Sequence, residues 1–275
     1  MAIDTLQTKI RKLKNPSMLA FSFESGWLPE GLDYENAAAS VLGALKDTLG
    51  AVRFCTSSFA LGGPEALTVQ QRLMAKARAL GYYVAMDMPG TVTPEQASAA
   101  QLLGNGWEAD GLVVSAWAGS DGWKGLLPLC KEGKDIFVVV RSANRSAPEL
   151  QDLITGGRLV HLAAADQVKR SGLELMGKYG YSAVGLVASA TAADINRNLR
   201  SKYQGVFVLV EGYDYRGANA KNCSYAFDKL GHGAVVCAGS SILSAWKEGE
   251  GSLEEAALKA AQRMKKNILN YIQIL

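Results

Sequence analysis

The chain has 275 residues, of which 48% are apolar and 20% are charged, so it is long enough to form one large domain with a substantial core. Its 29 basic and 26 acidic residues leave a net charge of +3, which is too balanced for a nucleic-acid-binding protein. The densest basic run, Lys9 to Lys14, lies on a predicted amphipathic N-terminal helix, where we interpret it as a solvated face.

The cysteines and the hydrophobic segments indicate where the protein is located. Cys55, Cys130, Cys223 and Cys237 show no CxxC pairing and no metal-ligand spacing, which favours reduced thiols in a reducing compartment. Charges recur through Lys14 where a signal peptide would be apolar, and no apolar run reaches the roughly 20 residues of a membrane helix. The sequence therefore predicts a cytoplasmic protein with no membrane partner.

Short β-rich segments alternate with helical segments eight times along the chain. Several of the β-rich segments are almost continuous in Val, Ile, Leu and Phe, which is typical of parallel strands covered on both faces. The predicted strands are 18–23, 50–55, 82–87, 111–116, 135–141, 182–188, 205–211 and 233–238. The predicted helices are 34–48, 64–80, 94–104, 120–131, 161–178, 190–202, 217–230 and 253–273.

Eight such units without a linker predict a single-domain α/β protein, a (β/α)₈ TIM barrel over residues 1–275. An open doubly wound sheet is the alternative, and the absence of a GxGxxG motif after the first strand weighs against it. Because the active sites of such barrels lie at the carboxyl ends of the strands, the candidate functional residues are those that follow each strand.

The strand ends supply acids and arginines. Lysine is absent from residue 77 through residue 123, so Asp87, at the end of the third strand, is an acid without an evident cationic partner. His161 and His232 fall in a helix and a loop, which disfavours a histidine-based catalytic or metal site. For each charged residue the alternative is a salt bridge that closes the end of the barrel. The charged residues expected there are Glu24, Arg53, Asp87, Arg141, Glu211, Asp214 and Arg216.

Several stretches of the chain together resemble the orotidine 5′-phosphate decarboxylases of the longer-chain bacterial subgroup. The most specific stretches are VVVRSAN at 138–144, ELQDL at 149–153, GKYGYSAVG at 177–185 and VLVEGY at 208–213. The resemblance implies a barrel that removes CO₂ from the pyrimidine of orotidine monophosphate, in UMP biosynthesis, without a metal or an organic cofactor. It also implies a homodimer.

The resemblance further implies a network of alternating charges, of which this chain keeps little. In the family an Asp ends strand one, a Lys lies on strand two, and strand three bears Asp-x-Lys-x-x-Asp, whose Lys protonates C6 as CO₂ leaves. The corresponding positions here are Ser22, Arg53 and Asp87, and residues 88–91 supply neither a Lys nor a second Asp. Arginine keeps the charge of lysine but does not give up a proton near neutral pH.

The ligand contacts that the resemblance implies are altered as well. The pyrimidine-reading Thr-Ser-Asn of the family appears here as Ser142, Ala143 and Asn144. Arg216 can attract an anion, whereas Glu211 and Asp214 oppose one. The residues at the family's phosphate-binding positions are Glu211, Gly212, Tyr213, Arg216 and Ser240.

These observations predict a decarboxylase-like barrel that has lost decarboxylase activity and binds a nucleotide monophosphate or another small anion. One alternative is an active decarboxylase, or a related lyase, with a site rebuilt from Arg53, Asp87, Glu211 and Arg216. A second alternative is a non-catalytic subunit of a paralogous decarboxylase. The missing second Asp, which a partner's site would borrow, weakens that alternative.

Overall fold

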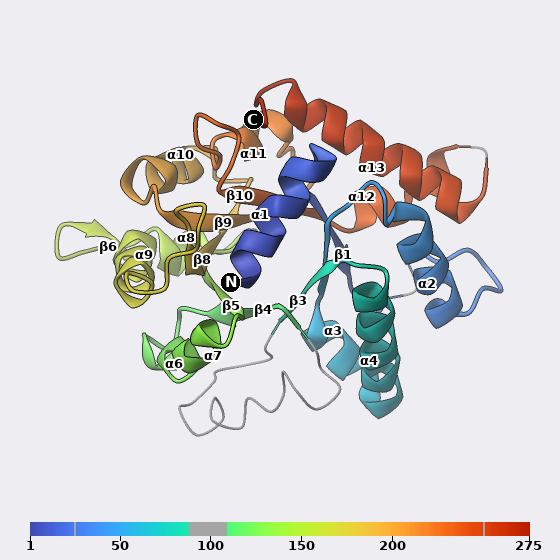
Figure 1. The fold of residues 1–275 in the computed structure, drawn as a ribbon, viewed down its shortest axis with the longest axis horizontal. Coiled ribbons are helices and arrows are strands. Elements are labelled where there is room, and N and C mark those ends of the chain that lie inside the picture. Colours follow the sequence, from blue (N-terminus) through green and yellow to red (C-terminus); the bar gives the residue numbers. More distant parts are fainter. Residues whose placement is uncertain (25, 88–108, 250) are drawn as a thin grey trace.

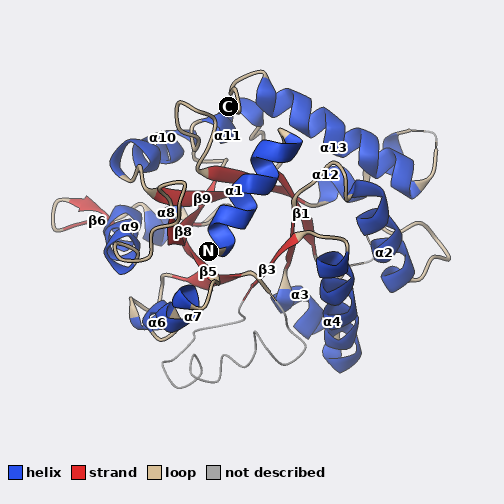
Figure 2. Ribbon diagram, viewed as in Figure 1, coloured by secondary structure: helices blue, strands red, loops and turns tan. Residues whose placement is uncertain are grey.

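The computed structural model describes residues 1–24, 26–87, 109–249 and 251–275. Eight parallel strands close into a barrel in the order β1-β10-β9-β8-β5-β4-β3-β2, with helices around the outside (Figures 1 and 2). The barrel strands are β1 (Ser17–Phe21), β2 (Ala51–Phe54), β3 (Tyr83–Asp87), β4 (Gly111–Ser115), β5 (Asp135–Arg141), β8 (Ser182–Ser189), β9 (Val206–Glu211) and β10 (Ala234–Ala238). The predicted (β/α)₈ fold and its eight strands are confirmed, and the open sheet is wrong.

The described helices follow the predicted pattern, although their bounds differ in several places. The described helices are α1 (Ala2–Leu13), α2 (Tyr34–Leu45), α3 (Thr56–Leu61), α4 (Gly63–Ala79), α6 (Asp121–Lys124), α7 (Leu127–Lys131), α8 (Pro148–Gln151), α9 (Val160–Ser171), α10 (Ala193–Lys202), α11 (Ala220–Ser224), α12 (Ser240–Leu243) and α13 (Leu253–Leu269). The predicted helix 120–131 is divided into α6 and α7, because Pro128 in the first turn of α7 begins a new helix. The predicted helix 94–104 lies outside the described residues.

Two further differences lie beside β5 and β8. Helix α9 ends at Ser171, seven residues before the predicted end, and Gly172 follows it where a Cβ would stand 2.2 Å from the Ser182 hydroxyl. Before α9, a short antiparallel hairpin of β6 (Ile154–Thr155) and β7 (Arg158–Leu159) was not predicted. Its turn is Gly156-Gly157, both at positive φ, a conformation that glycine adopts without steric cost.

Two hydrophobic clusters hold the barrel together. One lies between the strands and the surrounding helices, and the other fills the barrel interior, where Ile3, Leu6 and Ile10 of α1 cover one end. Side chains of a strand alternate between these clusters with a period of two. Along β2, Ala51 belongs to the inner cluster while Val52 and Phe54 belong to the outer one. The same alternation directs Arg53 into the barrel.

All four cysteines are free thiols. Among the described residues, no helix combines the length and the apolar character that crossing a bilayer requires.

Arg200 of α10 is a buried cation that stabilises the fold through backbone carbonyl groups. It is 8% exposed, and its Nε donates to the carbonyl oxygen of Ala226 at 2.6 Å. Nη2 donates to Gly233 at 2.6 Å, and Nη1 donates to Val206 at 3.0 Å. Arg200 thereby ties α10 to the start of β9 and to the segment that leads into β10.

Replacing Arg200 should therefore destabilise the barrel. We expect Arg200→Met to lower the free energy of unfolding by about 3 kcal/mol, because several buried carbonyl oxygens lose their donor at once. Lys202→Met, at the exposed end of the same helix, removes the same charge and should change stability by less than about 0.5 kcal/mol. Urea unfolding of both variants checks this, and equal midpoints would contradict the assigned role.

Candidate functional site

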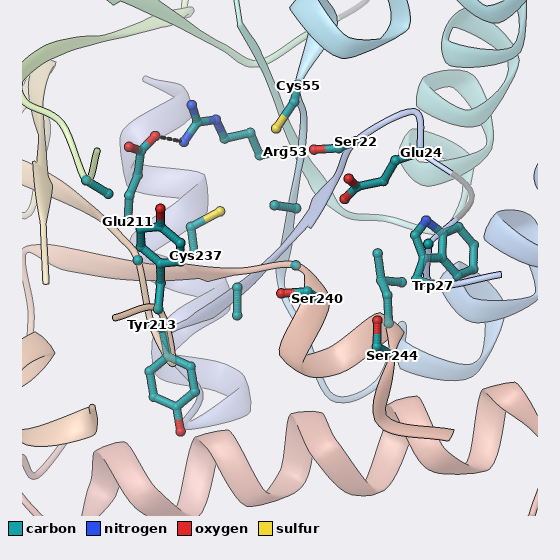
Figure 3. A pocket seen from close by; sticks show the side chains of 18 residues that line it. Ser22, Glu24, Trp27, Arg53, Cys55, Glu211, Tyr213, Cys237, Ser240 and Ser244 are labelled. Carbon is teal, nitrogen blue, oxygen red and sulfur yellow. Dashed lines mark hydrogen bonds and ion pairs between the residues drawn. The ribbon is translucent and has the colours of Figure 1, made fainter. Parts of the chain in front are cut away.

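A cavity of about 540 Å³ opens at the carboxyl ends of the strands (Figure 3). It lies among the ends of β1, β2, β9 and β10 and the segments that follow them. Its described lining is Ala20, Ser22, Glu24, Gly26, Trp27, Arg53, Cys55, Ala143, Glu211, Gly212, Tyr213, Tyr215, Cys237, Ala238, Gly239, Ser240, Leu243 and Ser244. This is the end of a TIM barrel at which function is expected.

Arg53 lies at the centre of the charged groups in this region. Its side chain is 9% exposed, and it donates from Nε to Asp87 Oδ1 at 2.6 Å and from Nη2 to Asp87 Oδ2 at 3.1 Å. Its Nη1 donates to Glu211 Oε1 (Figure 3). One guanidinium therefore joins two carboxylates, one of them bidentately, which is the strong geometry for such pairs.

The strand register explains why these three residues meet. Arg53 is paired with Ala85 on β3, so Asp87 lies two residues further along the adjacent strand and on the same face. Glu211 ends β9, which is separated from β2 by β1 and β10. The Arg53 side chain therefore reaches across the mouth of the barrel to a residue 158 positions away in the sequence.

The Asp87 pKa shows that the burial of this network is costly for its charges. Burial raises the pKa of Asp87, and this outweighs the attraction of Arg53, which lowers it. For Arg53, burial opposes the charged form, but Asp87 and then Glu211 outweigh it and hold the pKa well above its usual value. Arg53 therefore stays a cation, and it does not serve as an acid.

The two thiols in the lining are poor nucleophiles at neutral pH. Burial raises the pKa of Cys55 to about 11 and that of Cys237 to about 12. Because the thiolate is the reactive form, neither thiol is activated.

The structure brings most of the predicted site residues to this cavity. Ser22, Arg53, Ala143, Glu211, Gly212, Tyr213 and Ser240 line it. Asp87 joins through Arg53, so the expectation that this acid has no cationic partner is wrong. The tip of Tyr213 points away towards α13, where its hydroxyl lies 3.4 Å from Asn267 Nδ2.

The remaining predicted residues lie off the cavity lining. Ser142 is held by the side chain of Gln151, whose Oε1 accepts from the Ser142 backbone N–H at 2.9 Å. Asn144 is exposed and accepts from the Ser142 hydroxyl at 2.6 Å. Arg216 is exposed with φ 52°. The predicted motif residues 88–91 lie outside the described part of the chain.

Arg141, expected at the rim, belongs to a separate structural cluster. It donates from Nε and Nη2 to both Asp152 carboxylate oxygens, at 2.9 and 3.0 Å. His161 Nδ1 lies 3.1 Å from the same carboxylate and 2.8 Å from the Gln151 carbonyl oxygen. These contacts fasten the segment after β5 to α9. For Arg141 they agree with the alternative given above, in which a charged residue at a strand end forms a structural salt bridge.

Several lining residues were not expected from the sequence, among them Cys237, Trp27 and Ser244. Cys237 follows from the two-residue period of β10, which could have been read from the sequence. Trp27 and Ser244 lie in irregular segments after β1 and α12, where no sequence period indicates a direction.

Sequence comparison identifies named relatives, although no family model matches the chain. An orotidine 5′-phosphate decarboxylase of Clostridium novyi is 24% identical over 285 residues, in an alignment that covers 98% of both chains. The Clostridium acetobutylicum protein of the same name is 30% identical over 181 residues, which are 64% of this chain and 63% of that protein. The chain is therefore similar, along nearly its whole length, to proteins named orotidine 5′-phosphate decarboxylase.

Solved structures share the fold of this chain. A Leishmania donovani OMP decarboxylase superposes with a TM-score of 0.75 at 16% identity, over 98% of this chain and 99% of that one. A provisionally assigned orotidine 5′-phosphate decarboxylase of Streptomyces avermitilis gives 0.82 at 21% identity, over 98% and 95%. The assignment of Ser22, Arg53 and Asp87 to the family's catalytic positions stays a prediction.

The Arg53 network should be strongly coupled. We expect Arg53→Met to lower the free energy of unfolding by about 3–5 kcal/mol, because it leaves two acids without their cation. Adding Glu211→Gln should recover part of that loss. Arg72→Met, which breaks a bidentate but half-exposed pair with Glu35, should cost about 0–1 kcal/mol. Double-mutant cycles by urea unfolding measure the coupling, and purely additive losses would contradict the network.

Asp87 should make stability depend on pH. Because its pKa is raised in the folded state, the folded chain holds this proton more tightly than the unfolded chain does. The contribution of Asp87 is fully present below the ordinary Asp pKa of about 3.9 and is lost as the pH rises through the folded-state value. The stability of the wild type relative to Asp87→Asn should therefore fall as the pH rises above about 4, measured by urea unfolding. A rising difference would contradict the assigned direction.

Proposed function

We propose that this orotidine 5′-phosphate decarboxylase relative no longer decarboxylates orotidine monophosphate and instead binds a small ligand in the cavity at the barrel mouth. The observation that carries the proposal is the commitment of Arg53 to Asp87 and Glu211. In the family that the chain resembles, one lysine lies on strand two, and a second lysine, on strand three, delivers the proton to C6. Here the cation at the second strand is already neutralised by protein carboxylates.

The described lining also lacks a lysine or histidine that could act as the proton donor. Its thiols have raised pKa values. The undescribed segment 88–108 contains no Lys, Arg or His in its sequence, so it supplies no ammonium beside Asp87. Loss of one group that stabilises a transition state typically costs roughly 10²–10³ in rate. Several such losses, even when they are not additive, take the rate below a useful level.

A working lyase with a rebuilt site is the second candidate. Arg53, Asp87 and Glu211 do meet, as that reading requires, while Arg216 is exposed and does not line the cavity. Burial raises the pKa of Asp87, which makes its carboxyl the candidate proton donor of this reading. Activity that depends on Asp87 would favour this candidate.

The ligand class, the homodimer and the cytoplasmic location remain predictions from the sequence. A nucleotide-like or other anionic ligand is expected from the resemblance, whereas the acids of the lining oppose an anion. Light scattering of the purified protein measures the oligomeric state, and a monomer would contradict the expected dimer.

An assay for loss of orotidine monophosphate tests the proposed loss of activity. Protein purified from a host deleted for its own decarboxylase should show no turnover above the protein-free blank. Consumption of orotidine monophosphate with saturation kinetics, abolished in Asp87→Asn, would overturn the proposal. Turnover that persists unchanged in Asp87→Asn and in Arg53→Met would indicate a contaminating enzyme, and a second independent purification would then decide.

A further inference from the structure

The charged side chains around the cavity carry a net negative charge. Three carboxylates, those of Glu24, Asp87 and Glu211, lie in or against the lining, and Arg53 is the one basic side chain among its described members. The residues outside the described part, 25, 88–108 and 250, contain no Lys, Arg or His that could change this balance. A cavity that focuses a negative potential concentrates cations and repels anions.

Glu24 differs from the other two acids because it has no cationic partner among the described residues. It follows β1 and is exposed at the cavity, and Figure 3 places it on the opposite side from Glu211 and Arg53. The hydroxyl groups of Ser240 and Ser244, also in the lining, make no side-chain hydrogen bond to another described residue. This side of the cavity therefore offers one unpaired negative charge and two free hydroxyl groups.

Trp27 adds an independent indication of a ligand on the same side. Its side chain lines the cavity and is 2% exposed, yet its indole N–H has no acceptor among the described residues. Figure 3 shows the indole nitrogen on the edge of the ring that faces the cavity, near Glu24. A buried donor without an acceptor is costly, and a ligand oxygen placed there would satisfy it.

We propose that the mouth of the barrel binds a phosphate-free small molecule of nucleoside size whose positively charged amine is held by Glu24. The inference rests on the ligand binding proposed above and names the class of that ligand. The cavity of about 540 Å³ has the size of a small-molecule site. The amine pairs with the Glu24 carboxylate, and an acceptor oxygen of the same molecule receives the Trp27 N–H. A phosphate in this place would instead meet Glu24 with like charge.

Three uridine compounds that differ only in the group at the 5′ carbon test the inference: 5′-amino-5′-deoxyuridine, uridine and uridine 5′-monophosphate. Isothermal titration at pH 7 should give an affinity for the amine about tenfold higher than for uridine, which is the usual effect of one charge-assisted hydrogen bond. Uridine 5′-monophosphate should bind more weakly than uridine.

Two charge variants assign any such preference to Glu24. Glu24→Gln should bring the affinities for the amine and for uridine to within about twofold of each other. Glu30→Gln, an exposed acid in the same loop and outside the lining, should keep the tenfold preference.

Three outcomes would overturn the inference: tightest binding of the monophosphate, equal binding of all three compounds, or no binding of any. Each of them leaves the proposed loss of decarboxylation standing, because that is decided separately by the turnover of orotidine monophosphate. Conversely, turnover together with an amine preference that depends on Glu24 would overturn the loss of activity and keep the ligand class.

Discussion

A buried guanidinium must be matched by negative charge, and the mouth of this barrel is arranged around that requirement. Arg53 is almost fully enclosed, so water cannot solvate its charge, and Asp87 and Glu211 replace that solvation with three hydrogen bonds. The requirement fixes the direction of both carboxylates. It also joins the adjacent strands β2 and β3 to β9, which is separated from β2 by β1 and β10. The floor of the cavity is therefore a set of paired charges.

The closed sheet makes this arrangement possible. In an open sheet, the ends of β2 and β9 would lie in a row with two strands between them, whereas closure curves both ends towards one lumen. The alternation of side chains then selects which residues enter the lumen. The same alternation that packs Ala51 into the inner cluster directs Arg53 to the same inner face as Asp87. The packing of the barrel and the position of the site residues thus depend on the same two-residue alternation of side chains.

The sequence was sufficient for the strands, because buried parallel strands are nearly continuous in apolar residues and cannot be mistaken for loops. It was not sufficient for the pairing of Asp87, because no basic residue lies near position 87 in the sequence. The cation that pairs with Asp87 lies 34 positions earlier, on the adjacent strand. The predicted helix lengths were wrong where a glycine ends a helix early, as at Gly172, or where a proline begins a new helix, as at Pro128. Ser142 and Asn144 do not line the cavity, and no local pattern indicates the contact that Ser142 makes with Gln151.

The charge of the mouth depends on one proton. When Asp87 is protonated, the charges of Arg53 and Glu211 cancel, and Glu24 alone makes the cavity negative. When Asp87 is ionised, Arg53, Asp87 and Glu211 together carry one additional negative charge. The raised pKa of Asp87 places this change above the ordinary range for an Asp. Binding and protonation are linked reciprocally, so a cationic ligand favours the ionised carboxyl and an anionic ligand favours the protonated one. Because Arg53 stays a cation, the Asp87 carboxyl is the proton-dependent group of this network.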